Sequence, residues 1–145
     1  MSRARDMANL IHTEEKPNRN IVINGAMGVD QRTGGGAALT GLGSSNGMTY
    51  AIDRFGLYTT YTDGRLSMQK VAISDVNAPG FRSALKLSCT TADTSIAANE
   101  LVSCTQQIEG QNLQTLKKGT ASAEPVVASF YAKGNATATY MFIFF

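Results

Sequence analysis

The sequence contains one histidine, no tryptophan, two cysteines and three prolines among its 145 residues. With His12 as the only imidazole, neither a Ser-His-Asp triad nor a histidine-based metal site can be argued from the sequence. Cys89 and Cys104 lie too far apart for a zinc-binding or redox motif. We expect both cysteines to be small buried hydrophobic residues, and we expect no metal and no cofactor.

Long apolar runs are also missing. No stretch of about 18 apolar residues could cross a bilayer, and the basic start, MSRARDMANLIHTEEKPNRN, lacks the apolar core of a secretory signal. The 13 basic and 11 acidic residues leave a net charge of +2, which is too small for a nucleic-acid-binding surface. We therefore expect neither a membrane nor a nucleic acid as a partner.

Residues 2–12 are predicted to form a short helix. They contain neither glycine nor proline, and their apolar residues recur at three- and four-residue steps along one face. This face consists of Ala4, Met7, Ala8 and Ile11. A lone helix of about 11 residues is marginal in water, so we expect it to dock on its own domain, on sister copies or on another protein. His12 is expected to meet the dipole at the helix end rather than to act in catalysis.

The next zone contains a β-branched run and many glycines. Asn20-Ile21-Val22-Ile23-Asn24-Gly25 predicts a short buried strand that ends at Asn-Gly. Residues 33–52 carry no charge and contain six glycines, which predicts a long flexible loop or an extended excursion. No lysine follows these glycines in Walker spacing, so a phosphate cradle is not expected.

From residue 66 onward, apolar and polar residues alternate with a period of two, which is typical of strands with one buried face. The apolar positions are Leu66 and Met68; Leu85, Leu87 and Cys89; Val102, Cys104 and Ile108; Val126, Ala128 and Phe130; and Ala136, Ala138, Tyr140 and Phe142. Residues 111–116 predict one short helical turn. The sequence therefore predicts a mainly antiparallel β-sandwich behind a short N-terminal helix.

Candidate site residues are few, and each has a structural alternative. The aspartates Asp30, Asp53, Asp63 and Asp75 lack calcium-loop spacing, and turn or strand-end roles are expected for most of them. No pair of them can be chosen for glycoside cleavage. Two interpretations stay open for Tyr50, Phe55, Tyr58 and Tyr61, namely a sugar-stacking shelf and core packing. Arg54, next to Asp53, is expected to fasten a loop through a charge-assisted bond rather than to contact a ligand.

The last six residues hold four of the eleven aromatic residues: Tyr140, Phe142, Phe144 and Phe145. If these residues formed an exposed edge strand, that strand would be prone to aggregation. We expect either burial at a subunit contact or a natural polypeptide that continues past Phe145, and we favour the second.

Several motifs resemble those of tail-fibre-type structural proteins of bacteriophages, notably marine and cyanobacterial ones. The segments that carry the resemblance are Asn18-Arg19-Asn20-Ile21-Val22-Ile23-Asn24-Gly25-Ala26-Met27, Val29-Asp30-Gln31-Arg32, Asp53-Arg54-Phe55, Gln107-Ile108-Glu109-Gly110 and Ala128-Ser129-Phe130-Tyr131-Ala132-Lys133, together with the leader Arg3-Ala4-Arg5-Asp6-Met7-Ala8-Asn9-Leu10-Ile11. Phe55 and Tyr131 stand where the family pattern has tryptophan. None of these motifs is catalytic.

The resemblance implies a carbohydrate-binding-like jelly roll that is usually trimeric and mounted on the virion. A jelly roll needs about eight strands, whereas six or seven are predicted here. We therefore expect a virion-anchoring helix and linker at residues 1–17 and a jelly-roll-like domain, shortened at its C-terminus, at residues 18–145.

The expected function is that of a non-enzymatic virion protein. In the leading interpretation it is a tail fibre, or its virion-proximal part, assembled in the host cytoplasm. Its helix anchors to a tail adaptor or another virion protein, and its β domain supports attachment to a host-surface glycan through avidity. The alternatives are a capsid-decorating protein or head fibre, and a depolymerase of host polysaccharide.

Overall fold

In the part of the chain that the structure describes, alternating apolar residues and tight turns produce six strands and one short helix. The computed structural model describes residues 20–74, 80–135 and 139–144. The elements in chain order are β1 (Leu39–Leu42), β2 (Gly47–Ile52), β3 (Phe55–Thr60), β4 (Arg65–Ala72), β5 (Ser83–Thr91), β6 (Leu101–Thr105) and the 3₁₀ helix η1 (Gly110–Leu116).

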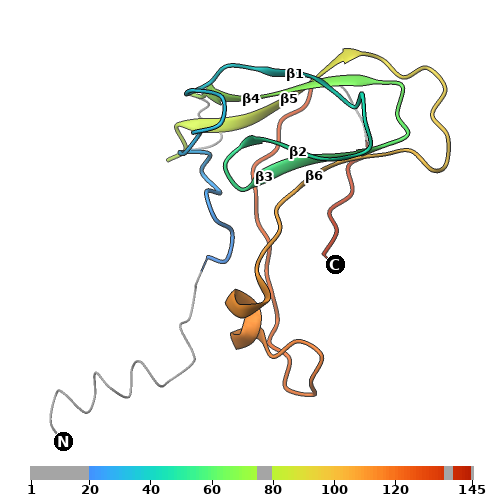
Figure 1. The fold of residues 1–145 in the computed structure, drawn as a ribbon. Coiled ribbons are helices and arrows are strands. Elements are labelled where there is room, and N and C mark those ends of the chain that lie inside the picture. The colour runs from blue at the N-terminus through green and yellow to red at the C-terminus, as the bar shows by residue number, and fades with distance from the viewer. Residues whose placement is uncertain (1–19, 75–79, 136–138, 145) are drawn as a thin grey trace, which may run out of the picture.

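The strands form two antiparallel sheets of three strands each, with the orders β1-β4-β5 and β2-β3-β6. Figure 1 shows one sheet above the other, and η1 projecting away from both. Consecutive strands pair as hairpins in β2-β3 and β4-β5, whereas β1 and β6 pair with strands more distant in the sequence. Each sheet therefore depends on one long-range pairing.

The core lies between the two sheets. Its buried cluster takes Leu42 and Met68 from the first sheet and Ala51 and Leu57 from the second. Full burial of a side chain such as that of Met68 contributes roughly 1.5–3 kcal/mol. The buried hydroxyl of Thr59 donates to the carbonyl of Ser45 at 3.0 Å, so this polar group is satisfied. Hydrophobic packing thus holds the two sheets together, and the buried Thr59 hydroxyl does not oppose it because it is hydrogen-bonded.

The mainly antiparallel β character is confirmed. The alternation beginning at Leu66, at Leu85 and at Val102 falls in β4, β5 and β6, and the predicted helical turn is η1. Lys117 follows η1 in the left-handed conformation with a φ of 49°, so the helix ends at Leu116, where the predicted turn also ends.

Two predictions in the first third of the chain are wrong. Residues 20–25 form no strand, because Asn24 takes a φ of 58° and its carbonyl accepts the N–H of Met27 in a turn. Of the two alternatives predicted for residues 33–52, the long flexible loop is wrong, because the range contains the extended strands β1 and β2. Glycines with positive φ, such as Gly43 at 97°, provide the turn between those strands.

The predicted burial is also wrong at several positions. Cys89 and Cys104 are free and exposed, and Leu87 is 40% exposed. β5 and β6 each lie at a sheet edge, so their apolar faces are only partly covered. Alternation predicted β4, β5 and β6 correctly but not how much of each face is covered.

The predicted final strands are not found in the described residues. Residues 126–130 and 139–144 run outside both sheets, and 136–138 are not described. The predicted leading helix, with its face Ala4, Met7, Ala8 and Ile11, also lies outside the described residues. Within the described ranges, no helix has the length and apolar character needed to span a membrane.

Candidate functional site

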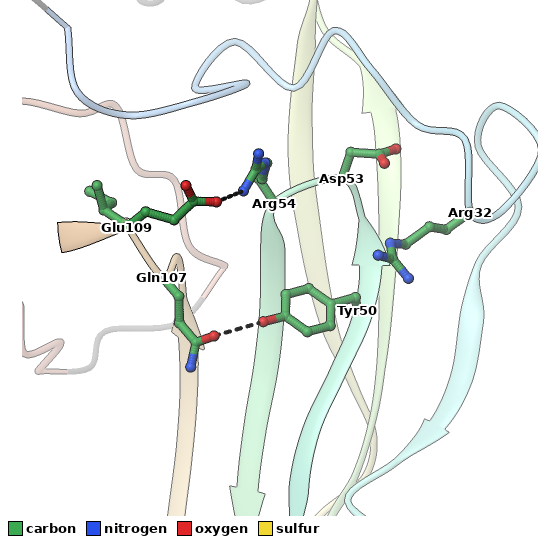
Figure 2. Close-up of a pocket in the computed structure, with 7 residues that line it drawn as sticks. Arg32, Tyr50, Asp53, Arg54, Gln107 and Glu109 are labelled. Atoms are coloured by element: carbon green, nitrogen blue, oxygen red, sulfur yellow. Dashed lines mark hydrogen bonds and ion pairs between the residues drawn. The ribbon is translucent and has the colours of Figure 1, made fainter. Parts of the chain in front are cut away.

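An open cleft of about 430 Å³ lies where the turn between β2 and β3 meets the segment that follows β6 (Figure 2). Three parts of the chain that are distant in the sequence contribute to it. The lining residues are Arg32, Tyr50, Asp53, Arg54, Gln107, Ile108 and Glu109. Two guanidinium groups, two carboxylates, one amide and one phenol thus line a single space.

The two-residue turn Asp53-Arg54 carries two of the charged groups. Arg54 has a φ of 72°, a left-handed conformation that non-glycine residues adopt rarely. Its Nη1 atom lies 3.7 Å from Oε1 of Glu109, and the two side chains are 48% and 56% exposed. Exposed ion pairs contribute at most about 1 kcal/mol. The pair therefore orients the turn against the segment after β6 more than it stabilises the fold.

Tyr50 forms an aromatic wall of the cleft. Its hydroxyl donates a hydrogen bond to Oε1 of Gln107 at 3.3 Å. The guanidinium carbon of Arg32 lies over the ring, 5.2 Å from its centroid, in a cation–π contact. Gly56 stands opposite Tyr50 in β3, and a Cβ there would come within 3.1 Å of the tyrosine ring. The missing side chain at Gly56 therefore makes room for the ring.

The loop before β1 reaches the cleft because two side chains hold it there. The amide nitrogen of Asn24 donates to the carbonyls of Val29 and Asp53, both at 2.9 Å, and its oxygen accepts the N–H of Val29 at 3.0 Å. Gln106 accepts the N–H of Ile23 at 2.9 Å and donates to its carbonyl at 2.7 Å, as a paired strand would. These bonds place Arg32 at the cleft.

Asp30 fastens the turn that carries Arg32. Its carboxylate accepts the hydroxyl of Thr33 at 2.6 Å and the N–H of Thr33 at 3.2 Å. The hydroxyl bond is the main cause that holds the pKa of Asp30 below its ordinary value, and the backbone bond adds to it. The predicted turn role of Asp30 is confirmed.

Both carboxylates of the cleft already accept hydrogen bonds. Oδ2 of Asp53 accepts the N–H of Gln31 at 2.6 Å, and Oε2 of Glu109 accepts the side-chain amide of Gln111 at 3.0 Å. These hydrogen bonds hold both carboxylates at the wall of the cleft.

Of the four aromatic residues predicted as a shelf or as core, only Tyr50 lines the cleft. Phe55 packs against the core cluster, as core packing requires, and Tyr61 at the end of β3 is 65% exposed. Tyr58 does not contribute to the lining. The cleft therefore uses one of these four aromatic residues, and core packing is confirmed for Phe55.

The expected loop-fastening role of Arg54 is confirmed, with Glu109 as its partner. Sequence reasoning did not single out Arg32, Gln107 or Glu109 as site residues. A signal was available, because all three belong to segments that carry the phage resemblance. Asp75 lies outside the described residues.

A second hollow of about 410 Å³ opens between the start of β4 and the start of β6. Leu66, Leu101 and Val102 line it, together with Cys89. Asp93 stands at its edge and accepts three hydrogen bonds from the surrounding loops. The hollow is thus largely apolar, and an acidic residue fastens its rim.

The chain matches no protein-family model, no curated protein and no solved structure.

Within the described ranges, no group of three or more His, Cys, Asp or Glu side chains is arranged to hold a metal ion.

Proposed function

We propose that this chain is a non-enzymatic structural protein of a bacteriophage virion, and that it forms part of a tail fibre supporting attachment to the host surface. The proposal starts from the motifs that resemble tail-fibre-type proteins. Described residues of four of those segments, at 20–27, 29–32, 53–55 and 107–110, meet around one cleft. Their side chains act mainly as fasteners, as the bonds of Asn24 and the Arg54–Glu109 pair illustrate.

The observation that carries the proposal is the apolar surface of the C-terminal segments. Nine large hydrophobic residues there are between 38% and 91% exposed. They are Val126, Val127, Phe130, Tyr131, Tyr140, Met141, Phe142, Ile143 and Phe144. Exposed apolar residues of which Phe130, Phe142 and Phe144 contact one another mark a contact with another molecule. In a fibre, sister copies of the chain would cover these residues.

These segments also bear on the fold that we propose. The rings of Phe130 and Phe142 stack with centroids 5.4 Å apart, so the two C-terminal segments meet. If both paired with strands of a neighbouring copy, the two observed sheets would extend toward a jelly-roll-like sandwich. We propose a homotrimer of this kind, attached through the leading segment to a tail adaptor or another virion protein.

Labelling of virions tests the proposal. Gold-labelled antibody against the chain is applied to particles of the phage that encodes it, and the label is expected at the tail. Label on the head would instead favour a capsid-decorating protein or head fibre, and particles without label would refute a virion role.

The anchoring segment can be tested with a matched pair of variants. Met7→Lys places a charge on the predicted helix face, whereas Asn9→Lys adds the same charge away from it. We expect Met7→Lys, like deletion of residues 2–12, to abolish incorporation into particles and Asn9→Lys to retain it. Equal incorporation of both variants would contradict anchoring through this face.

The depolymerase alternative has a separate assay. Purified chain is incubated with host surface polysaccharide, and the length of the polysaccharide is followed by size-exclusion chromatography. We expect no shortening. Released oligosaccharides that disappear with Asp53→Asn or Glu109→Gln would overturn the non-enzymatic function.

A further inference from the structure

The cleft contains polar groups that the fold leaves available. The guanidinium of Arg32 lies on the ring of Tyr50 and forms no ion pair with a carboxylate in the described part of the chain. Gln107 accepts the tyrosine hydroxyl through its oxygen, and its NH₂ group donates no hydrogen bond within the described part of the chain. Oδ2 of Asp53 accepts the N–H of Gln31, which leaves Oδ1 to accept a hydrogen bond from a ligand. Donors and an acceptor thus stand around one hollow.

The charges of the lining balance. Arg32 and Arg54 contribute two positive charges, and Asp53 and Glu109 contribute two negative ones. A cleft without net charge has no general attraction for a strongly anionic or cationic ligand. It also lacks the excess of carbonyl and carboxylate oxygens that a calcium site uses, since Arg54 neutralises Glu109. The lining therefore favours an uncharged polar ligand.

The required ligand must both donate and accept hydrogen bonds at neighbouring positions. A hydroxyl group does both: it donates to a carboxylate such as Asp53 and accepts from a guanidinium or an amide. The ring of Tyr50 and the side chain of Ile108 add apolar contacts. A volume of about 430 Å³ lies within the range of small-molecule sites. A sugar meets these requirements, because it carries neighbouring hydroxyl groups on a ring that also has an apolar face.

We propose that this cleft binds a pyranose unit of an uncharged saccharide through two adjacent hydroxyl groups. Arg32 and Gln107 donate to the hydroxyls, Asp53 accepts from them, and Tyr50 contacts the ring. The inference rests on the proposed role in host attachment and specifies the site and the ligand class. Because the cleft is open, one copy would bind a saccharide weakly. Several copies on one particle would supply the avidity.

The support behind these groups is already in place. The Tyr50 ring holds the Arg32 guanidinium by a cation–π contact, and Asp30 fastens the turn before it. The absence of a side chain at Gly56 leaves the space that the Tyr50 ring occupies. A site with side chains oriented before binding loses less conformational entropy when the ligand arrives.

Saturation-transfer NMR and titration calorimetry test the site with defined probes. The full chain is mixed with methyl glycosides of glucose, galactose, mannose and N-acetylglucosamine, and with glucuronate and inorganic phosphate as charged comparators. We expect at least one uncharged glycoside to bind, and to bind more tightly than glucuronate and phosphate. Binding of none of the uncharged glycosides, or stronger binding of a charged comparator, would overturn the inference.

Substitutions then locate the site. Arg32→Ala and Gln107→Ala change exposed side chains, and Asp53→Asn keeps the shape of its side chain; we expect each to weaken binding at least tenfold. Lys86→Ala removes an exposed charge on β5, outside the lining, and should bind like the wild type. Thermal unfolding of each variant verifies the fold. Unchanged affinity in all three cleft variants would refute the site.

The inference and the proposed function fail separately. Virions labelled at the tail, together with a chain that binds no uncharged glycoside, would leave the tail role standing and remove the saccharide site. Glycoside binding that the cleft variants abolish, on a chain absent from virions, would keep the site and remove the virion role.

Discussion

The hydroxyl of Tyr50 and the side-chain amide of Gln107 lie 3.3 Å apart and connect β2 to the segment after β6 across the middle strand β3. Side chains on the outer strands of a three-stranded sheet normally meet a side chain of the central strand between them. Here the central position is Gly56, which pairs with both Tyr50 and Thr105. The sheet and the cleft therefore depend on the same glycine.

Substitution of Gly56 by alanine should destabilise the fold and disturb the cleft. The added Cβ would overlap the sulfur of Met48 and lie 3.1 Å from the Tyr50 ring. Overpacking of this kind costs typically 1–3 kcal/mol. We expect a lower free energy of unfolding by that amount in urea denaturation, and a changed tyrosine near-ultraviolet circular dichroism signal.

Gly28→Ala is the matched control, because no atom lies within 4 Å of a Cβ at that position. It should change the free energy of unfolding by less than about 0.5 kcal/mol. Equal effects of the two substitutions would contradict the role of Gly56.

Asn24 offers a second test, because it combines a left-handed backbone with three side-chain hydrogen bonds. Asn24→Gly loses the bonds but tolerates the φ of 58°, whereas Asn24→Ala loses both advantages. We expect stability to fall in the order Asn, Gly, Ala, with a total loss of about 1–3 kcal/mol. Urea denaturation measures the order, and an alanine variant as stable as the glycine variant would contradict the backbone contribution.

Three of the six strands found in the described residues could be predicted from alternation. The period of two around Leu66 and Met68 and around Leu85 and Leu87 predicts β4 and β5, which pair with each other over eight positions. The prediction of a strand at residues 20–25 was wrong because it relied on the preference of β-branched residues for strands, whereas the left-handed Asn24 makes a turn there. The segment is also held by Gln106, more than eighty residues away, and local sequence carries no information about that contact.

The cleft was harder to predict than the sheets for the same reason. Arg32, Tyr50 and Gln107 meet only because β6 pairs with β3 and the loop before β1 folds back to the hairpin. Arg54 was predictable as a loop fastener from its charge and its place beside Asp53. Its partner Glu109 was not, because that contact depends on long-range pairing.

Exposed aromatic residues at the C-terminal end predict association in solution. The rings of Phe130, Phe142 and Phe144 pack together, with centroids 5.4 and 5.0 Å apart between successive pairs, while each residue stays more than half exposed. We expect sedimentation equilibrium to give a trimer at micromolar concentration. Phe142→Ser should shift the chain toward monomer, since it removes the central ring.

The control for this prediction is Tyr61→Ser, which removes a ring that is 65% exposed but lies outside the C-terminal segments. It should leave the trimer largely intact. A wild-type chain that sediments as a monomer would contradict the proposed fibre assembly.

The last prediction concerns pH and Asp93, which joins two loops at the rim of the second hollow. Its carboxylate accepts the N–H of Ser95 at 3.0 Å, the N–H of Asp63 at 3.0 Å and the hydroxyl of Thr62 at 3.1 Å. The Ser95 backbone bond is the main cause that lowers the pKa of Asp93 below its ordinary value of 3.8. The folded state therefore binds this proton less readily than the unfolded state.

The sign of the pH dependence follows from this lowered pKa. The stabilisation by Asp93 is complete above the ordinary value of 3.8 and is lost as pH falls through the lower, folded-state pKa. Asp93→Asn should thus be less stable than the wild type at pH 7, and the difference should shrink in acid. Asp63→Asn, which removes the same charge from the neighbouring loop, serves as the control. Urea denaturation between pH 7 and 2 measures both differences, and an Asp93→Asn difference that stays constant over that range would contradict the assignment.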